Sequence, residues 1–177
     1  VLSAKETINV KPDAVILATD SSVSKTWAPA FSNIGATVID HSTVWRMDDD
    51  HKLIIPEING HLLTAEDKII ASPNCTTTQL VMAIHPLYQQ YGIERLVIST
   101  YQSVTGAGKK GVDQLLAERQ GSLSMAEVFP EGIDFNVFPR VGIVQHNKHT
   151  DEEEKVVRET HKILADSSIG ITVTAVR

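Results

Sequence analysis

Short runs of apolar and β-branched residues alternate along this chain with longer segments of helical periodicity. The apolar runs cover Ala14–Thr19, Thr37–Asp40, Lys68–Ala71, Arg95–Thr100 and Ile171–Val176. Helical spacing covers Val23–Ile34, which Gly35 closes, and then Gln79–Tyr91, Lys109–Arg119 and Asp151–Ala165. Strands that alternate with helices in this way are typical of a parallel sheet with helices on its faces. The chain is therefore predicted to have an α/β fold, with a domain boundary near Pro73.

The only cysteine of the chain, Cys75, lies directly before one of these helical patterns. The Pro-Asn pair in front of it predicts that the thiol occupies the first turn of the helix. Unpaired backbone N–H groups and the positive end of the helix dipole stabilise a thiolate there, and a thiolate is the nucleophile of covalent acyl catalysis. The alternative interpretation is inert packing, because cysteine is among the most frequently buried residues.

Composition and charge argue against several classes of function. The chain carries a formal net charge of −6 and has no basic cluster beyond Lys109 and Lys110, which argues against nucleic acid and anionic membranes as partners. Its apolar runs are too short to cross a bilayer. A single cysteine cannot form an internal disulfide, which favours the reducing cytoplasm. None of the seven histidines has the spacing of a metal site, so no metal is predicted.

Several polar residues are candidate ligand contacts by residue type alone. Glu152 and Lys155 lie three residues apart and share one face of a predicted helix, where they could bind a zwitterionic phosphorylated ligand. The simpler interpretation is that the acidic residues of this segment complement the helix dipole. Arg46 and Arg177 are candidate anion-binding residues because a guanidinium pairs well with carboxylate and phosphate.

Six segments of the chain together carry a resemblance to a known family. They are Ser42–Asp48, Pro56–Asn59, Ser72–Leu80, Ser99–Lys109, Phe135–Pro139 and Thr174–Arg177. With these segments the chain resembles the aspartate-β-semialdehyde dehydrogenase family over nearly its whole length. The resemblance implies the latter part of a Rossmann-like NADP-binding domain over residues 1–73. It also implies that residues 74–177 form the first part of a glyceraldehyde-phosphate-dehydrogenase-like α+β catalytic and dimerisation domain.

The resemblance implies that NADPH reductively dephosphorylates β-aspartyl phosphate to aspartate semialdehyde through a thioacyl intermediate on a cysteine. The implied catalytic residues are Cys75, which attacks the acyl carbon, and Gln102, which orients the acyl group. The implied substrate contacts are Arg46, Asn74 and Lys155 for phosphate, Glu152 for the ammonium group and Arg177 for the α-carboxylate. The implied cofactor contacts are Thr19, Thr105 and Gly106. A homo-oligomer is expected by the same resemblance.

Some features depart from the family pattern. The chain begins at Val1 without a methionine and stops at Arg177 within a strand pattern, so we expect it to be an excerpt. The general-base histidine of the family is expected beyond Arg177, and the 177 residues alone are expected to be inactive. Asp20 stands in a turn where the family has small residues, and its carboxylate would repel a cofactor phosphate. The alternative hypothesis is a non-catalytic homologue that acts as an assembly or regulatory subunit.

Overall fold

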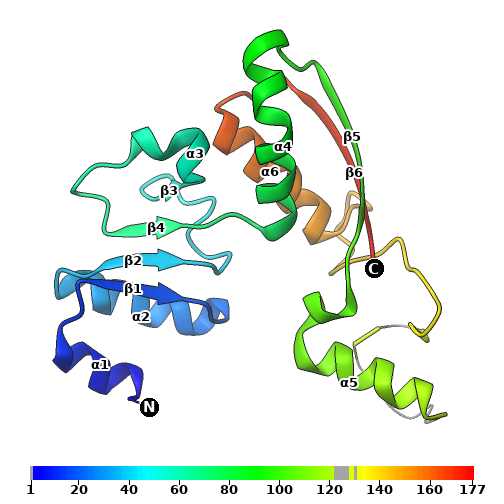
Figure 1. Ribbon diagram of the computed structural model, residues 1–177, viewed down its shortest axis with the longest axis horizontal. Helices are drawn as coiled ribbons and strands as arrows, with labels where there is room; N and C mark the ends of the chain where they lie inside the picture. The colour runs from blue at the N-terminus through cyan, green and yellow to red at the C-terminus, as the bar shows by residue number, and fades with distance from the viewer. Residues whose placement is uncertain (1, 122–127, 130) are drawn as a thin grey trace. The chain divides into compact units, whose positions relative to one another are not determined.

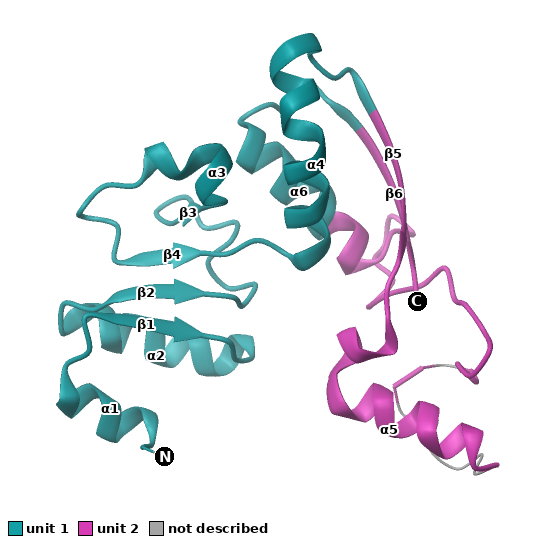
Figure 2. Cartoon of the chain, viewed as in Figure 1, with its two compact units in different colours: residues 1–95, 155–170 teal, residues 96–154, 171–177 magenta. Residues whose placement is uncertain are grey.

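The computed structural model describes residues 2–121, 128–129 and 131–177. The chain divides into two compact units (Figure 2). The first unit contains residues 1–95 and 155–170, and the second contains residues 96–154 and 171–177. Each unit is formed by two stretches that are separate in the sequence, so a later part of the chain completes each of them.

The first unit is built on a four-stranded parallel sheet with the strand order β1-β2-β4-β3 (Figure 1). Its strands are β1 (Ala14–Leu17), β2 (Thr37–Asp40), β3 (Lys52–Leu53) and β4 (Ile69–Ala71). Val15 pairs with Val38, and Val38 in turn pairs with Ile69, so branched apolar side chains form a row across three strands. The predicted parallel α/β class is confirmed.

Helix α2 (Ser21–Asn33) covers one face of this sheet. It buries Ser24, Ala28 and Phe31, which follow the spacing of one helix face. Ala28 and Phe31 join Leu17, Ala36 and Val38 in the hydrophobic core of the unit. The helix starts at Ser21 because the Asp20 carboxylate accepts hydrogen bonds from the backbone N–H groups of Ser22 and Val23.

The first unit also contains helices that join or follow the strands. These are α1 (Ala4–Val10), α3 (Pro56–Asn59), the 3₁₀ helix η1 (Gly60–Leu62) and α4 (Cys75–Tyr91). Most of α6 (Asp151–Leu164) belongs to this unit as well. The sequence patterns do not predict α1, β3, α3 or η1. Helix α4 ends at Gly92, whose φ of 71° lies in the left-handed region that favours glycine.

The second unit contains β5 (Arg95–Tyr101, from Leu96 onward), the 3₁₀ helix η2 (Val104–Ala107), α5 (Gly108–Arg119) and β6 (Gly170–Val176, from Ile171 onward). Strands β5 and β6 form a two-stranded sheet. The backbone N–H of Gln102 donates to the carbonyl of Val176 at 2.8 Å, which joins the chain just past β5 to the end of β6. This pairing places Gln102 beside the last residues of the chain. In the described part of the chain, no helix is long and apolar enough to cross a membrane.

Candidate active site

Cys75 is the first residue of helix α4, as the Pro-Asn pair predicts. The helix starts here because the side chain of Asn74 accepts a hydrogen bond from the backbone N–H of Thr76 at 2.7 Å. Thr77 and Val81 are fully buried and anchor one face of the helix, whereas Cys75 is exposed. The thiol is therefore accessible and lies at the positive end of a helix of 17 residues.

The loop after β2 holds Arg46 by means of a buried carboxylate. Asp40 is 0% exposed, and one of its oxygens accepts hydrogen bonds from the backbone N–H and the hydroxyl of Ser42, at 2.8 and 2.5 Å. Its second oxygen accepts from the Ser24 hydroxyl, which in turn accepts from the indole N–H of Trp45 at 3.0 Å. These contacts fix both sides of the loop, so the position of Arg46 is set by the fold.

Glu159 joins Arg46 to the start of α4. Its Oε1 accepts a hydrogen bond from Arg46 Nη1 at 2.9 Å, and its Oε2 accepts one from the backbone N–H of Asn74 at 2.6 Å. We call Arg46, Asn74, Cys75 and Glu159 the cysteine cluster. Glu159 is not among the predicted site residues. The sequence signal for it is a charged residue on the apolar stripe of α6, between Val156 and Ile163.

Three of the predicted site residues lie together in the second unit. Arg177 Nη2 donates a hydrogen bond to Gln102 Oε1 at 3.0 Å, and Gln102 Nε2 donates one to Glu152 Oε1 at 3.2 Å. We call Gln102, Glu152 and Arg177 the glutamine cluster. The amide of Gln102 bridges a cation and an anion, and these two contacts fix which end of the amide carries the oxygen.

The start of α6 is fastened to strand β6, and this places Glu152. Thr150 and Glu153 form a reciprocal pair, in which each backbone N–H donates to the side chain of the other, at 2.8 and 3.2 Å. The second oxygen of Glu153 accepts from the backbone N–H of Ala175 at 3.0 Å. Because Glu153 is buried, it acts as a fixed link between the helix that carries Glu152 and the strand that leads to Arg177.

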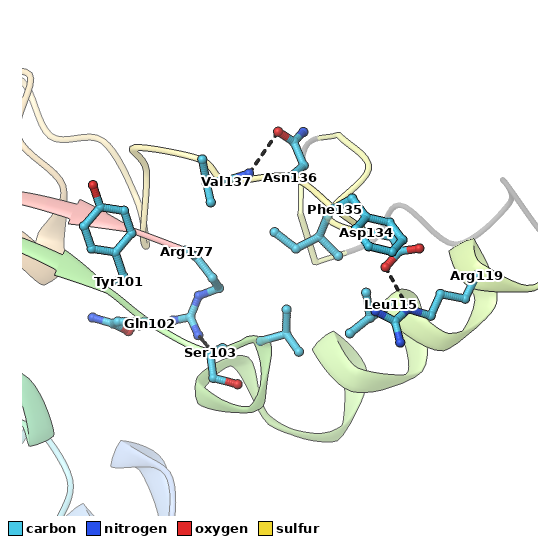
Figure 3. Close-up of a pocket in the computed structure, with 12 residues that line it drawn as sticks. Tyr101, Gln102, Ser103, Leu115, Arg119, Asp134, Phe135, Asn136, Val137 and Arg177 are labelled. Carbon is cyan, nitrogen blue, oxygen red and sulfur yellow. Dashed lines mark hydrogen bonds and ion pairs between the residues drawn. The ribbon is translucent and has the colours of Figure 1, made fainter.

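A cavity of about 560 Å³ opens beside the glutamine cluster. Figure 3 shows Arg177, Gln102 and Ser103 at one side of it and the ion pair between Arg119 and Asp134 at the other. Leu115, Ile133 and Val137 supply an apolar lining between them. An apolar cavity with a guanidinium and an amide at one side can hold and orient a small polar molecule.

Thr105 and Gly106, the predicted cofactor contacts, lie in η2. A Cβ atom on Gly106 would lie 2.6 Å from Arg177 Nη1, so the missing side chain makes room for the guanidinium. Arg177 Nη1 also donates to the carbonyl of Ser103 at 2.5 Å. Gly106 thus has a local reason to be glycine that does not involve a cofactor.

Thr19, the third predicted cofactor contact, is exposed just after β1, and ligands of parallel sheets bind at the carboxyl ends of the strands. The neighbouring N-terminus of α2 suits a phosphate poorly, because Asp20 occupies it. Hydrogen bonds from the Ser22 hydroxyl and the Val23 N–H lower the pKa of Asp20, so it remains a carboxylate at neutral pH. A cofactor phosphate placed at this turn would meet a like charge.

Lys155, the remaining predicted phosphate contact, lies on α6 three residues after Glu152 and is half-buried. On a helix this separation places the two side chains on one face. Among the described residues, no group of three or more His, Cys, Asp or Glu side chains could hold a metal ion.

The fold and the cysteine cluster define a class of protein: an α/β protein of the nucleotide-binding type with an accessible cysteine at a helix N-terminus. Residues 2–65 match the family model described as semialdehyde dehydrogenase, NAD binding domain. Residues 84–177 match the model described as semialdehyde dehydrogenase, dimerisation domain. The chain therefore belongs to the semialdehyde dehydrogenase family.

Individual relatives agree with this assignment. Aspartate-semialdehyde dehydrogenase of Aquifex aeolicus is 40% identical over 172 residues, which are 93% of this chain and 51% of that protein. The crystal structure of aspartate semialdehyde dehydrogenase II from Vibrio cholerae has a TM-score of 0.87 at 38% identity, and the match covers 93% of this chain and 51% of that chain. A structure of the Vibrio cholerae protein complexed with ASA is similar at 37% identity and a TM-score of 0.87. The chain spans about half the length of these relatives.

Proposed function

We propose that this chain is part of an NADP-dependent aspartate-semialdehyde dehydrogenase. In this proposal the enzyme converts β-aspartyl phosphate to aspartate semialdehyde and phosphate, and the reaction is reversible. The observation that carries the proposal is an exposed cysteine as the first residue of α4, joined through Asn74 and Glu159 to a buried arginine. Its relatives named aspartate-semialdehyde dehydrogenase support the same activity.

Cys75 would be the nucleophile. Its thiolate attacks the acyl carbon of β-aspartyl phosphate, a C–S bond forms, the C–O bond to phosphate breaks, and phosphate leaves with the bonding electron pair. Cys75 would then hold the acyl group as a thioester, and its sulfur would leave as the thiolate when aspartate semialdehyde forms. NADPH, when bound, would supply the hydride for this reduction. Because Cys75 is exposed and is the first residue of α4, its sulfur is accessible to the acyl carbon.

Arg46, Asn74 and Lys155 are the proposed phosphate contacts. A phosphate is bound well by cations and by backbone groups near a helix N-terminus, and these three residues supply a guanidinium, the N-cap of α4 and an ammonium group. Arg46 is 7% exposed, so its charge is little screened by water.

Gln102, Glu152 and Arg177 are the proposed contacts to the amino-acid part of the substrate. Arg177 can pair with the α-carboxylate, Glu152 with the ammonium group, and Gln102 can orient the acyl group between them. The hydrogen bonds within the glutamine cluster support this assignment, since they hold the two opposite charges on either side of one amide. Thr19, Thr105 and Gly106 remain the proposed cofactor contacts. We further propose a homo-oligomer, because the chain matches a dimerisation-domain model. A cytoplasmic location is proposed because a single cysteine suits a reducing compartment.

The decisive test is the variant Cys75→Ala in the full-length protein. Phosphate-dependent reduction of NADP with aspartate semialdehyde is expected to fall by at least about 10³-fold, because covalent catalysis needs the sulfur. Met82→Ala, at an exposed position on the same helix, is the control and should keep its rate. Full activity in Cys75→Ala would refute the proposal.

A second candidate function is a non-catalytic homologue that serves as an assembly or regulatory subunit. The observation that favours it is the carboxylate of Asp20 at the N-terminus of α2, where it would repel a cofactor phosphate. Titration of the full-length protein with NADP separates the two, because only the enzyme needs to bind the cofactor. We also propose that the 177 residues alone lack turnover.

A further inference from the structure

Glu159 is a buried carboxylate to which the proposed mechanism gives no role. It is 1% exposed, and burial of a charge is unfavourable unless the charge is paired and hydrogen-bonded. Both of its oxygens are engaged, one by the guanidinium of Arg46 and the other by the backbone N–H of Asn74. One carboxylate therefore contacts two separate elements, the loop after β2 and the start of α4.

The guanidinium of Arg46 is held in one orientation by this contact. Nη1 bonds to Glu159, and Nη2 donates to the carbonyl of His41 at 2.7 Å. The buried Nε has no hydrogen-bond partner in the described part of the chain. Two edges of the planar group are thus fixed and a third donor is left unsatisfied, so an anionic oxygen would complete its hydrogen bonding.

On its other side Glu159 fixes the residue that precedes the thiol. The backbone N–H of Asn74 is bound at 2.6 Å, while the Asn74 side chain caps the helix at the N–H of Thr76. The Asn74 peptide therefore cannot rotate without breaking a hydrogen bond to a buried charge. Since Cys75 is the next residue, the position of its backbone is set by the same carboxylate.

We propose that Glu159 is a positioning residue that aligns Arg46 and the Asn74–Cys75 peptide for the same acyl phosphate. This inference rests on the proposed function. It explains why a charge, which is costly to bury, lies on the apolar stripe of α6. Two acceptors on one rigid group can hold two donors at a fixed separation, which an apolar residue cannot do.

Two substitutions of Glu159 distinguish the effect of its side-chain length from the effect of its charge and its two acceptors. Gln has the size of Glu but only one acceptor, so it must turn an NH₂ group toward either Arg46 or the Asn74 N–H. Asp keeps the charge and both acceptors but is one methylene shorter. If Glu159 acts by alignment, kcat/KM should fall in the order wild type, Glu159→Asp, Glu159→Gln.

The experiment measures phosphate binding to the full-length protein in two ways. The first is the KM for phosphate in NADP reduction with aspartate semialdehyde. The second, which needs no turnover, is the phosphate concentration that half-protects Cys75 from alkylation by iodoacetamide, followed by mass spectrometry of the cysteine peptide. For Glu159→Gln we expect both values to rise about ten-fold, because one charge-assisted hydrogen bond is misaligned. The KM for aspartate semialdehyde should change less than about two-fold.

The controls make each outcome decisive. Glu154→Gln changes a carboxylate on the same helix that accepts a hydrogen bond from the side chain of Asn147, and it should leave both phosphate values unchanged. In an Arg46→Gln background, Glu159→Gln should have a smaller further effect, since one of the two groups that Glu159 aligns has already been removed. If Glu159→Gln does not fold, Glu159→Asp must show the same selective loss at smaller size.

Two results would overturn the inference. One is a Glu159→Gln variant with lowered thermal stability but wild-type phosphate values, which would make the contact structural only. The other is wild-type turnover that depends on Cys75 without any protection of Cys75 by phosphate. Failure of the proposed function is distinct, because wild-type protein would then show no phosphate-dependent turnover at all.

Discussion

The variant Gly106→Ala tests how the guanidinium of Arg177 is placed. A Cβ atom at this position would lie 2.6 Å from Arg177 Nη1 and 3.4 Å from Cζ, so one of the two groups must move. Arg177 Nη1 is the end of a flexible side chain, and Gly106 does not have a positive φ. The guanidinium is therefore expected to move while the backbone of η2 keeps its conformation.

The magnitude follows from the contacts that would be lost. Arg177 donates to the carbonyl of Ser103 at 2.5 Å and to Gln102 at 3.0 Å, and both bonds depend on the present position of the guanidinium. A hydrogen bond that involves a charged group contributes about 1.5–3 kcal/mol. If the displaced guanidinium loses one such bond to a substrate carboxylate, kcat/KM for aspartate semialdehyde should fall about 10- to 150-fold. If one of these two internal bonds is lost without replacement, the free energy of unfolding should fall by up to about 3 kcal/mol.

The assay is steady-state NADP reduction by the full-length protein, with aspartate semialdehyde and NADP varied separately. Gly60→Ala is the matched control, since a Cβ there would meet only Pro56 Cβ at 3.8 Å, an ordinary contact. A Gly106→Ala variant with kcat/KM within two-fold of wild type would refute the reasoning. A loss confined to the KM for NADP would refute it as well, and would favour the cofactor role for Gly106 instead.

Two further predictions concern stability. The hydrogen bond from Lys52, together with those from Thr64, lowers the pKa of Asp67 to about 2. The folded pKa lies below the unfolded value of about 3.9, so the stabilisation by the Asp67 carboxylate is present above pH 4 and is lost as the pH falls toward 2. The variant Asp67→Asn should therefore flatten the pH dependence of Tm between about pH 4 and pH 2. An unchanged slope would contradict this prediction. Phe31→Ala should lower the free energy of unfolding, measured by urea titration, by about 3–5 kcal/mol. Phe31 is 2% exposed in the core, and its ring centroid lies 6.2 Å from that of Trp27. A loss below about 1 kcal/mol would show that neighbouring side chains fill the space left by the ring.

The strands and long helices could be predicted because their apolar patterns have a clear period. Helix α1 was not predicted, although Ser3 and Glu6 form a capping box at its start. None of its residues is buried, so the helix lacks a strong periodic pattern of apolar residues. Strand β3 has two residues, Lys52 and Leu53, which are too few to show alternation. Its pairing with β4 sets its conformation, and that pairing depends on tertiary structure.

Some residues of the candidate site could likewise be predicted from the sequence, and others could not. The position of Cys75 at a helix start was predictable because capping is a local property of the sequence, and α4 confirms it. Glu159 was not predictable in the same manner, because its partners Arg46 and Asn74 lie 113 and 85 residues away. A charge within an apolar stripe indicates that a partner exists, but the identity of that partner depends on the fold.

In the glutamine cluster, the two neighbours of position 102 determine which residue types can occupy it. Gln102 lies between Arg177, which can only donate hydrogen bonds, and Glu152, which as a carboxylate can only accept them. A residue that bridges them must accept on one side and donate on the other. A carboxylate at position 102 would face Glu152 with a like charge, and a cation would face Arg177 with one. A side-chain amide long enough to reach both meets the requirement without adding charge.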